Sequence, residues 1–252
     1  MLLEVSGLHA HYGKSHVLDG VDITVSAPEI VAILGRNGSG RSTLLKTVMG
    51  LTPPSAGSVR LAGVALAGLP PHRIARAGLA YVPEERLVFD NLSVADNLAT
   101  GVKSGRPGAP RWTIEEIYEY FPRLWERRST KAGYLSGGEQ QMLTICRSLL
   151  GNPLLIMIDE PTEGLAPRIV ESVTEVIRDI LRRGVGVLLV EQKMTVALKV
   201  AQRVMIMGRG RIVFEGSPAA LQEDAEARRA WLEVSGEGRE AAKAMPNNKQ
   251  IG

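Results

Sequence analysis

The sequence predicts an α/β fold with a mainly parallel β-sheet, and two observations lead to this prediction. First, four short apolar runs lack the alternation of a half-exposed strand, and a continuous apolar run is typical of a parallel strand covered on both faces. They are EIVAILG (29–35), LAYVPE (79–84), LLIMIDE (154–160) and GVLLVEQ (186–192). Second, helical patterns lie between these runs, and alternation of strands with helices favours a parallel sheet flanked by helices.

Two regions depart from this alternation. Residues 2–26 and 58–63 look like strands joined by turns, and we expect them to form an antiparallel piece on the same domain. Residues 92–150 contain no convincing strand, so we interpret them as a helical insertion between two core strands. Within this insertion SGRPGAP (104–110) is rich in glycine and proline, which predicts a loop.

Two helices can be placed from their apolar patterns. In TIEEIYEYFPRLWERR, Thr113 and Glu116 form a capping box at the start, and Pro122 is expected to kink or interrupt the helix. Five apolar side chains are expected on one face of it: Ile117, Tyr118, Phe121, Leu124 and Trp125. In PRIVESVTEVIRDILRR, the apolar residues form one helical stripe: Ile169, Val170, Val173, Val176, Ile177, Ile180 and Leu181.

The composition narrows the class of protein. The chain has 252 residues and a net charge of only +3 without a strong basic run, which argues against nucleic-acid binding. It has one cysteine, Cys146, among apolar neighbours, so we interpret it as a core residue of a protein in a reducing compartment. No apolar run is long enough to span a membrane, and the start lacks the features of a signal peptide. The end, 236–252, has almost no large apolar residue and predicts a disordered tail.

The stretch GRNGSGRST matches a phosphate-binding loop, G-x-x-x-x-G-K-[ST], except that arginine occupies the lysine position. Its glycines let successive backbone N–H groups face one anion, and the helix that follows adds a favourable dipole. An apolar strand precedes it, as the motif requires. The predicted nucleotide-binding residues of this loop are Gly35, Arg36, Asn37, Gly38, Ser39, Gly40, Arg41, Ser42 and Thr43.

The run LLIMIDE ends in two carboxylates, which is the pattern of a strand that serves Mg²⁺ in nucleotide hydrolysis. Asp159 is expected to hold the water shell of the ion, and Ser42 to supply a direct ligand. Glu160 is expected beyond the γ-phosphate, where it can orient or deprotonate the attacking water. A solvated acidic pair at a strand end is the plainer interpretation, but the upstream phosphate loop disfavours it.

The stretch LSGGEQQ (135–141) opens a further helix with a Ser-Gly-Gly turn, a second anion-binding helix N-terminus. With the two preceding motifs, it makes the chain resemble the ATP-binding subunits of ABC transporters over about residues 1–235. The resemblance implies a P-loop NTPase (RecA-like) core whose cofactors are ATP and Mg²⁺. It also implies that the signature residues Ser136, Gly137 and Gly138 close over the phosphate loop of a second ATPase domain.

A narrower resemblance is to the LivF-type ATPases of branched-chain amino-acid importers. It rests on LPPHRIARAGLAYVPEERLVF (69–89), LSVADNL (92–98), LSGGEQQML (135–143), DEPTEGLAP (159–167) and LLVEQK (188–193). Three substitutions relative to generic ABC proteins fit this subfamily. Glu84 replaces a glutamine, Ala166 an aspartate, and Gln192 the switch histidine.

The resemblance assigns roles to single residues. It implies that Tyr12 stacks on the adenine ring, although a partly buried strand tyrosine is the alternative. It implies that Glu84 acts with the metal or its water, and that Gln192 donates a neutral hydrogen bond to the γ-phosphate. His9 and His11 alternate on a strand but have no third ligand at suitable spacing, so we interpret them as surface or edge residues.

The resemblance also implies partners that composition and spacing do not show. They are a second ABC ATPase subunit, two membrane permease subunits and, through the permease, an extracytoplasmic solute-binding protein. The implied location is the cytoplasmic face of the cell membrane, as a peripheral subunit. The transported solute is a branched-chain amino acid or a related small polar solute.

Arg41 leaves the activity open. It keeps the charge of the usual lysine, but its planar fork requires two oxygens in its plane. Three alternatives follow: a working transport ATPase, a nucleotide-binding but weakly hydrolysing half of a heterodimeric pair, or a soluble ABC protein that acts on nucleic acid or ribosomes. The third is disfavoured because the chain has neither two ATPase domains nor a long coiled-coil insertion.

Overall fold

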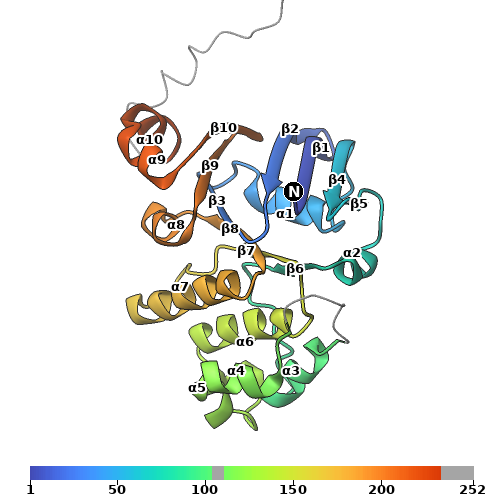
Figure 1. Cartoon of the computed structure of the whole chain (residues 1–252), viewed down its shortest axis with the longest axis vertical. Coiled ribbons are helices and arrows are strands. Elements are labelled where there is room, and N and C mark those ends of the chain that lie inside the picture. Colours follow the sequence, from blue (N-terminus) through green and yellow to red (C-terminus); the bar gives the residue numbers. More distant parts are fainter. Residues whose placement is uncertain (104–110, 234–252) are drawn as a thin grey trace, which may run out of the picture.

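The computed structural model describes residues 1–103 and 111–233. The predicted loop at 104–110 and the predicted tail at 236–252 lie outside these ranges. Figure 1 shows an antiparallel β-sheet near one end of the molecule, a central sheet, and a group of helices at the other end.

The N-terminal sheet confirms the predicted antiparallel piece. Its strands lie in the order β2-β1-β4-β5, and each adjacent pair is antiparallel. Their bounds are β1 (Leu3–Tyr12), β2 (Ser15–Val25), β4 (Ala56–Leu61) and β5 (Val64–Ala65). Residues Gly13 and Lys14 form the turn between β1 and β2, so the two long strands are a hairpin.

The central sheet has six strands in the order β10-β9-β3-β8-β7-β6, and only the β9–β10 pair is antiparallel. The four apolar runs form four of its parallel strands, which confirms the predicted α/β fold. The sequence analysis assigned no strand to residues 203–216, which form the other two. The bounds are β3 (Ile30–Leu34), β6 (Leu79–Val82), β7 (Leu155–Asp159), β8 (Gly186–Glu191), β9 (Arg203–Gly208) and β10 (Arg211–Gly216).

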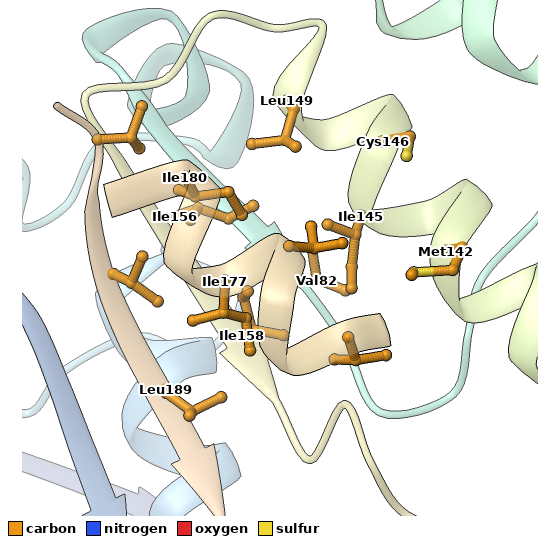
Figure 2. Packing of buried hydrophobic residues seen from close by; sticks show 14 of the residues in the cluster. Val82, Met142, Ile145, Cys146, Leu149, Ile156, Ile158, Ile177, Ile180 and Leu189 are labelled. Carbon is orange, nitrogen blue, oxygen red and sulfur yellow. The ribbon is translucent and has the colours of Figure 1, made fainter. Parts of the chain in front are cut away.

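The central sheet separates two hydrophobic cores. Alternate residues of a strand point to opposite faces, so Val31 and Ile33 of β3 join the core with the antiparallel sheet and α1, whereas Ile30 and Ala32 join the core with the helices. Every residue of β3, β7 and β8 is therefore buried. Figure 2 shows the helical side, where side chains of α6 and α7 pack over those of β6, β7 and β8.

Eleven helical segments accompany the sheets in the described residues. These segments are α1 (Arg41–Val48), α2 (Pro71–Ala77), α3 (Val94–Gly101), α4 (Ile114–Tyr120), α5 (Pro122–Glu126), the 3₁₀ helix η1 (Ala132–Tyr134), α6 (Gly137–Leu149), α7 (Pro167–Arg182), α8 (Met194–Val200), α9 (Pro218–Glu223) and α10 (Ala225–Trp231).

Between β6 and β7 the described residues form helices joined by loops and no strand, apart from a single bridge between Ser93 and Lys131. The predicted capping box of Thr113 and Glu116 starts α4, and the chain breaks at Phe121 before Pro122 starts α5. Trp125 does not share the buried face: its side chain is 49% exposed, and Arg128 stacks on its ring at 3.8 Å. Its ring still lies edge-on to the Tyr118 ring, with centroids 5.2 Å apart, so the two side chains share one side as expected while Trp125 stays half exposed.

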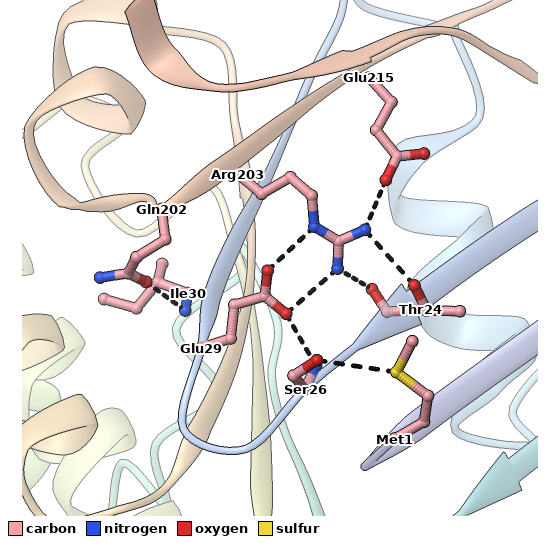
Figure 3. A network of polar contacts seen from close by, with 8 residues as sticks. All are labelled: Met1, Thr24, Ser26, Glu29, Ile30, Gln202, Arg203 and Glu215. Carbon is pink, nitrogen blue, oxygen red and sulfur yellow. Dashed lines mark hydrogen bonds and ion pairs between the residues drawn. The ribbon is translucent and has the colours of Figure 1, made fainter.

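A polar network ties the two sheets together (Figure 3). The guanidinium of Arg203 on β9 donates to both carboxylate oxygens of Glu29, at 2.9 and 3.1 Å. It also donates to the carbonyl oxygen of Thr24 on β2 and to the carboxylate of Glu215 on β10. One side chain therefore connects strands of both sheets.

The last described helices pack on the end of the central sheet (Figure 1). The Trp231 ring of α10 lies against Gly208 of β9, where an added Cβ would come within 2.4 Å of the ring.

Trp112, near the start of α4, is buried under the guanidinium of Arg183 at 4.0 Å. In the part of the chain that the structure describes, no helix has the length and apolar character required to cross a membrane.

Candidate functional site

The predicted phosphate loop joins β3 to α1 in the central sheet. Gly40 has a φ of 108°, a left-handed conformation that favours glycine, and it is the N-cap residue of α1. Gly35 lies so close to β9 that an added Cβ would be 2.5 Å from the carbonyl oxygen of Met207. The two glycines therefore let the loop turn sharply between the strand and the helix.

A cavity of about 280 Å³ lies over this loop. Three acidic residues line its other side: Glu84, which follows β6, and Glu160 and Glu163, which follow β7. The carboxyl ends of parallel strands share one edge of a sheet, which explains why these segments meet. The loop residues that line the cavity are Asn37, Gly38, Ser39, Gly40, Arg41, Ser42 and Thr43. Gly35 is buried at the end of β3 and Arg36 is exposed, so neither lines the cavity.

Asp159 is buried at the end of β7, and one of its carboxylate oxygens is available to a cation. Its Oδ1 atom is buried and has no hydrogen-bond partner among the residues that the structure describes. Burial raises the pKa of this carboxyl, while the nearby Ser42 hydroxyl and Arg41 guanidinium act to lower it. A buried carboxylate oxygen beside a serine hydroxyl is the donor set that Mg²⁺ takes in nucleotide sites, so these residues fit the ion.

Glu160 has an unusual conformation and an unusual pKa. Its φ of 43° is rare for a residue with a side chain, and its backbone N–H donates to the Val190 carbonyl at 2.9 Å. Burial raises the pKa of Glu160 to about 7, against the opposing effect of the Arg41 guanidinium, and the Glu163 carboxyl adds to the rise. A carboxyl with a pKa near neutrality is suited to accept a proton from water.

Arg41 is buried, with 4% of its side chain exposed, and its guanidinium is already occupied. One terminal nitrogen donates to the Glu191 carbonyl oxygen at 2.7 Å, and the other forms an ion pair with Glu160 Oε1 at 2.7 Å. The second nitrogen also reaches Asn37 Oδ1 at 3.4 Å. In this structure the loop's cation is therefore paired with the carboxylate predicted to activate water.

Glu84 and Glu163 complete a carboxylate cluster with Glu160, in which one oxygen of each lies within 4.8 Å of the others. Burial raises the pKa of Glu84, and so does the adjacent Glu163. Sequence reasoning missed Glu163. The turn after β7 brings it back to the cavity, because its N–H donates to the Glu160 carbonyl at 3.2 Å. Its position three residues after Glu160 was the available clue.

The other predicted nucleotide residues lie outside this cavity. Tyr12 is 51% exposed near the end of β1, and its hydroxyl is 3.1 Å from Thr52 Oγ1. Gln192 is exposed directly after β8. Ser136 caps α6 through a capping box with Glu139. The structure thus groups the phosphate loop with Glu84, Asp159 and Glu160, and leaves these positions apart.

The turn at Ser136 is closely packed. An added Cβ at Gly137 would meet the Arg86 guanidinium at 2.4 Å, and one at Gly138 would meet the Ile169 side chain at 2.9 Å. Arg86 also donates to the Glu163 carbonyl at 2.6 Å. Helix α6 packs in the core on the helical face of the central sheet and α1 in the core on the opposite face, and the turn does not line the cavity over the phosphate loop.

His9 is partly buried and His11 is exposed on β1, and the two do not belong to one group of possible metal ligands. The sequence analysis found no third ligand for His9 and His11, but the hairpin brings His16 and Asp19 to His9. The β1–β2 register pairs His11 with His16, and this folding back across strands is invisible to spacing along one strand. The spacing of residues along one strand therefore does not reveal this group of side chains.

The chain was compared with known families and proteins. Residues 18–163 match the family described as ABC transporter. The branched-chain amino acid transport ATP-binding protein BraG of Pseudomonas aeruginosa is 42% identical over 92% of this chain and 99% of its own length. The probable LivF protein of Archaeoglobus fulgidus is 36% identical over 88% and 94%. The lipopolysaccharide export protein LptB of Haemophilus influenzae is 33% identical over 92% and 97%.

Solved structures give the same fold. An ATP-binding cassette of an ABC transporter in its ADP conformation has a TM-score of 0.78 at 25% identity, over 90% of this chain and 97% of its own. The ATP-binding subunit of another ABC transporter has a TM-score of 0.76 at 28% identity, over 92% and 96%.

Proposed function

Since this chain belongs to the ABC transporter family and is one of its ATP-binding subunits, we propose that it couples ATP binding and hydrolysis to the uptake of branched-chain amino acids or a related small polar solute. The observation that carries the catalytic part is the cavity that the phosphate loop shares with Glu84 and Glu160, with Asp159 buried behind it. The similarity to BraG and LivF supports the solute class.

The role proposed for each residue follows from its position around the cavity. The loop backbone and the start of α1 bind the phosphates, and Ser42 with Asp159 holds Mg²⁺, with Glu84 close to the ion or its water. Bound Mg²⁺ supplies charge neutralisation for the phosphates. Glu160 accepts the proton of the attacking water, and Gln192 donates to the γ-phosphate. Tyr12 stacks on the adenine, since an exposed aromatic face can bind a flat base.

The proposed assembly needs more than this chain. Within one chain the Ser136 turn does not line the cavity over the phosphate loop, so we propose that each composite site uses the loop of one ATPase subunit and the turn of another. Residues 1–235 form the ATPase domain, and the helical insertion at 92–150 contacts the permease. Two permease subunits and an extracytoplasmic solute-binding protein complete a transporter in which this chain is peripheral, on the cytoplasmic face of the membrane.

The catalytic assignment is tested by Glu160→Gln in the assembled complex. Loss of a general base lowers turnover by about 10²–10⁴-fold, while Mg-ATP binding is retained because the loop is unchanged. Steady-state ATP hydrolysis and equilibrium ATP binding measure the two effects. Glu171→Gln, an exposed glutamate on α7, is the matched control and should leave turnover unchanged. Equal loss in both variants, or no loss with Glu160→Gln, would remove Glu160 from the proposal.

The solute is tested by uptake of labelled leucine, isoleucine and valine in cells that lack this chain. Wild-type chain should restore uptake and Glu160→Gln should not. Uptake that is unaffected by loss of the chain would reject the branched-chain assignment and leave the family assignment in place. Because the chain is also similar to LptB, lipopolysaccharide export should be measured in the same cells for comparison with amino-acid uptake.

The ion pair between Arg41 and Glu160 favours a second candidate, a nucleotide-binding half that hydrolyses weakly. A guanidinium paired with the water-activating carboxylate must leave it before Arg41 can act on the phosphates and Glu160 on the water. The asymmetry is tolerable in a heterodimer, because this chain would still offer its Ser136 turn to the phosphate loop of a competent partner.

A further inference from the structure

The β1–β2 hairpin brings together two imidazoles and a carboxylate outside the cavity described above. We name His9, His16 and Asp19 the hairpin cluster. His9 lies on β1, and the other two lie on β2, which folds back alongside it. Their side chains are 32%, 38% and 32% exposed, so solvent ions can reach them.

The distances within the hairpin cluster suit a single metal ion. His9 Nδ1 lies 3.0 Å from His16 Nε2 and 3.7 Å from Asp19 Oδ1, and His16 Nε2 lies 4.0 Å from the same oxygen. Tetrahedral Zn²⁺ with bonds of about 2.0–2.1 Å holds its ligand atoms roughly 3.4 Å apart. The three observed separations lie on both sides of that value, so small side-chain rotations would bring the atoms to one ion.

The side chains of the cluster are held in place by their neighbours. Arg211 of β10 donates to Asp19 Oδ2 at 2.8 Å, which leaves Oδ1 turned toward the histidines. The His16 ring stacks on His11 with centroids 4.2 Å apart and an interplanar angle of 2°. His11 is fixed in turn, because its Nδ1 lies 3.0 Å from Ser55 Oγ. Supports of this kind orient metal ligands in known sites.

The charges around the cluster set what it can bind. The Arg211 hydrogen bond lowers the pKa of Asp19, so this carboxyl is ionised at neutral pH. The same guanidinium also offsets the carboxylate's charge, so affinity depends chiefly on the two imidazoles. Nitrogen ligands select Zn²⁺, Cu²⁺ or Ni²⁺ over Mg²⁺ and Ca²⁺, which prefer oxygen.

From this geometry we propose that the hairpin cluster is a binding site for a divalent transition metal of the Zn²⁺ class. His9 coordinates through Nδ1, His16 through Nε2 and Asp19 through Oδ1, and water fills the fourth position. The ion displaces the proton that the two imidazoles share at 3.0 Å. The site needs neither ATP nor a partner subunit, so it stands apart from the proposed transport function.

The test is Zn²⁺ titration of the untagged full-length chain by calorimetry, with excess Mg²⁺ present to occupy the carboxylate cavity. The chain has four histidines, so His72→Gln, an exposed histidine on α2, is a matched control. We expect one Zn²⁺ per chain in the wild type and in His72→Gln. His16→Gln and Asp19→Asn should each weaken binding by at least about tenfold.

Histidine ¹⁵N NMR supplies an independent reading. Zn²⁺ should shift Nδ1 of His9 and Nε2 of His16 to metal-bound values, and the nitrogens of His72 should keep theirs. Absence of tight Zn²⁺ binding in the wild type would overturn the proposal. Equal affinity in the wild type and in His16→Gln, with both variants folded by circular dichroism, would overturn it as well.

Discussion

Arg41 stands at the lysine position of the phosphate loop, and both ends of its guanidinium are paired within the chain. Its guanidinium bridges the Glu191 carbonyl and the Glu160 carboxylate, which a single ammonium at the end of a lysine cannot do in the same planar geometry. The sequence indicates only that arginine replaces lysine. The buried ion pair with Glu160 is the structural reason to expect that the replacement restrains catalysis.

We therefore predict that Arg41→Lys raises steady-state ATP turnover of the assembled complex by roughly tenfold or more, up to the 10²–10³ that a single electrostatic donor can contribute. Lysine places a compact charge at the phosphates and leaves Glu160 free to act on water. The measurement compares kcat for the wild type, Arg41→Lys and the double variant with Glu160→Gln.

The double variant is the control, because its turnover should fall with or without the lysine. Equal kcat for the wild type and Arg41→Lys would contradict the prediction and make Arg41 a full substitute for lysine.

Single residues also show where sequence reasoning stops. The loop residues from Asn37 to Thr43 meet Glu84 and Glu160 because motif order and sheet topology place both at one sheet edge. Glu163 reaches the same cavity through a turn, and His16 reaches His9 through strand pairing. Both contacts depend on how the chain folds back on itself, which a match to the motif alone does not show.

At the scale of elements, burial of one face fixes the long helix α7. Its buried side chains are Val173, Val176, Ile177 and Ile180, the centre of the predicted stripe. We predict that Ile177→Ala lowers the free energy of unfolding by about 2–5 kcal/mol, because it leaves a cavity between α7 and the sheet. Urea unfolding measures the change.

The control for this prediction is Ser172→Ala, an exposed position on the same helix that should change the free energy of unfolding by less than about 0.5 kcal/mol. Similar losses in both variants would contradict the prediction, because burial of Ile177 would then contribute no more than an exposed position.

The elements that were predicted correctly have one property in common. Each has an apolar pattern that is complete within one short stretch of sequence. Four buried strands and the α7 stripe have it. Strand β10 alternates between exposed and half-buried residues at the edge of the sheet, and this weak pattern was missed. Trp125 lies beside Tyr118 as the pattern predicts, but the pattern does not show that about half of its surface stays exposed.

At the scale of the whole molecule, the network around Arg203 connects the antiparallel sheet to the central one (Figure 3). Burial acts to raise the pKa of Glu29, but hydrogen bonds from Arg203 and Ser26 outweigh it and hold the pKa below its usual value of 4.5. A carboxyl with a lowered pKa stabilises the folded state above its unfolded pKa, and this contribution is lost as the pH falls below it.

We predict that Glu29→Gln lowers the free energy of unfolding at pH 7 by about 1–3 kcal/mol. The variant should also lose less stability than the wild type between about pH 5 and pH 3, because it lacks the group that becomes protonated there. Denaturant unfolding at several pH values measures both effects.

Glu226→Gln, at an exposed glutamate of α10, is the control and should leave the pH dependence of unfolding unchanged. Parallel stability curves for the wild type and Glu29→Gln would show that the network does not respond to acid.

The placement of the three tryptophans has an optical consequence. Trp112 and Trp125 lie in the helical region, and Trp231 lies against the end of β9, so none of them lines the cavity over the phosphate loop. Phosphates bound in this cavity would therefore not contact a tryptophan of the same chain. A change in tryptophan emission on adding ATP to the isolated subunit would report a rearrangement that has travelled from the loop to the helices or to the C-terminal end.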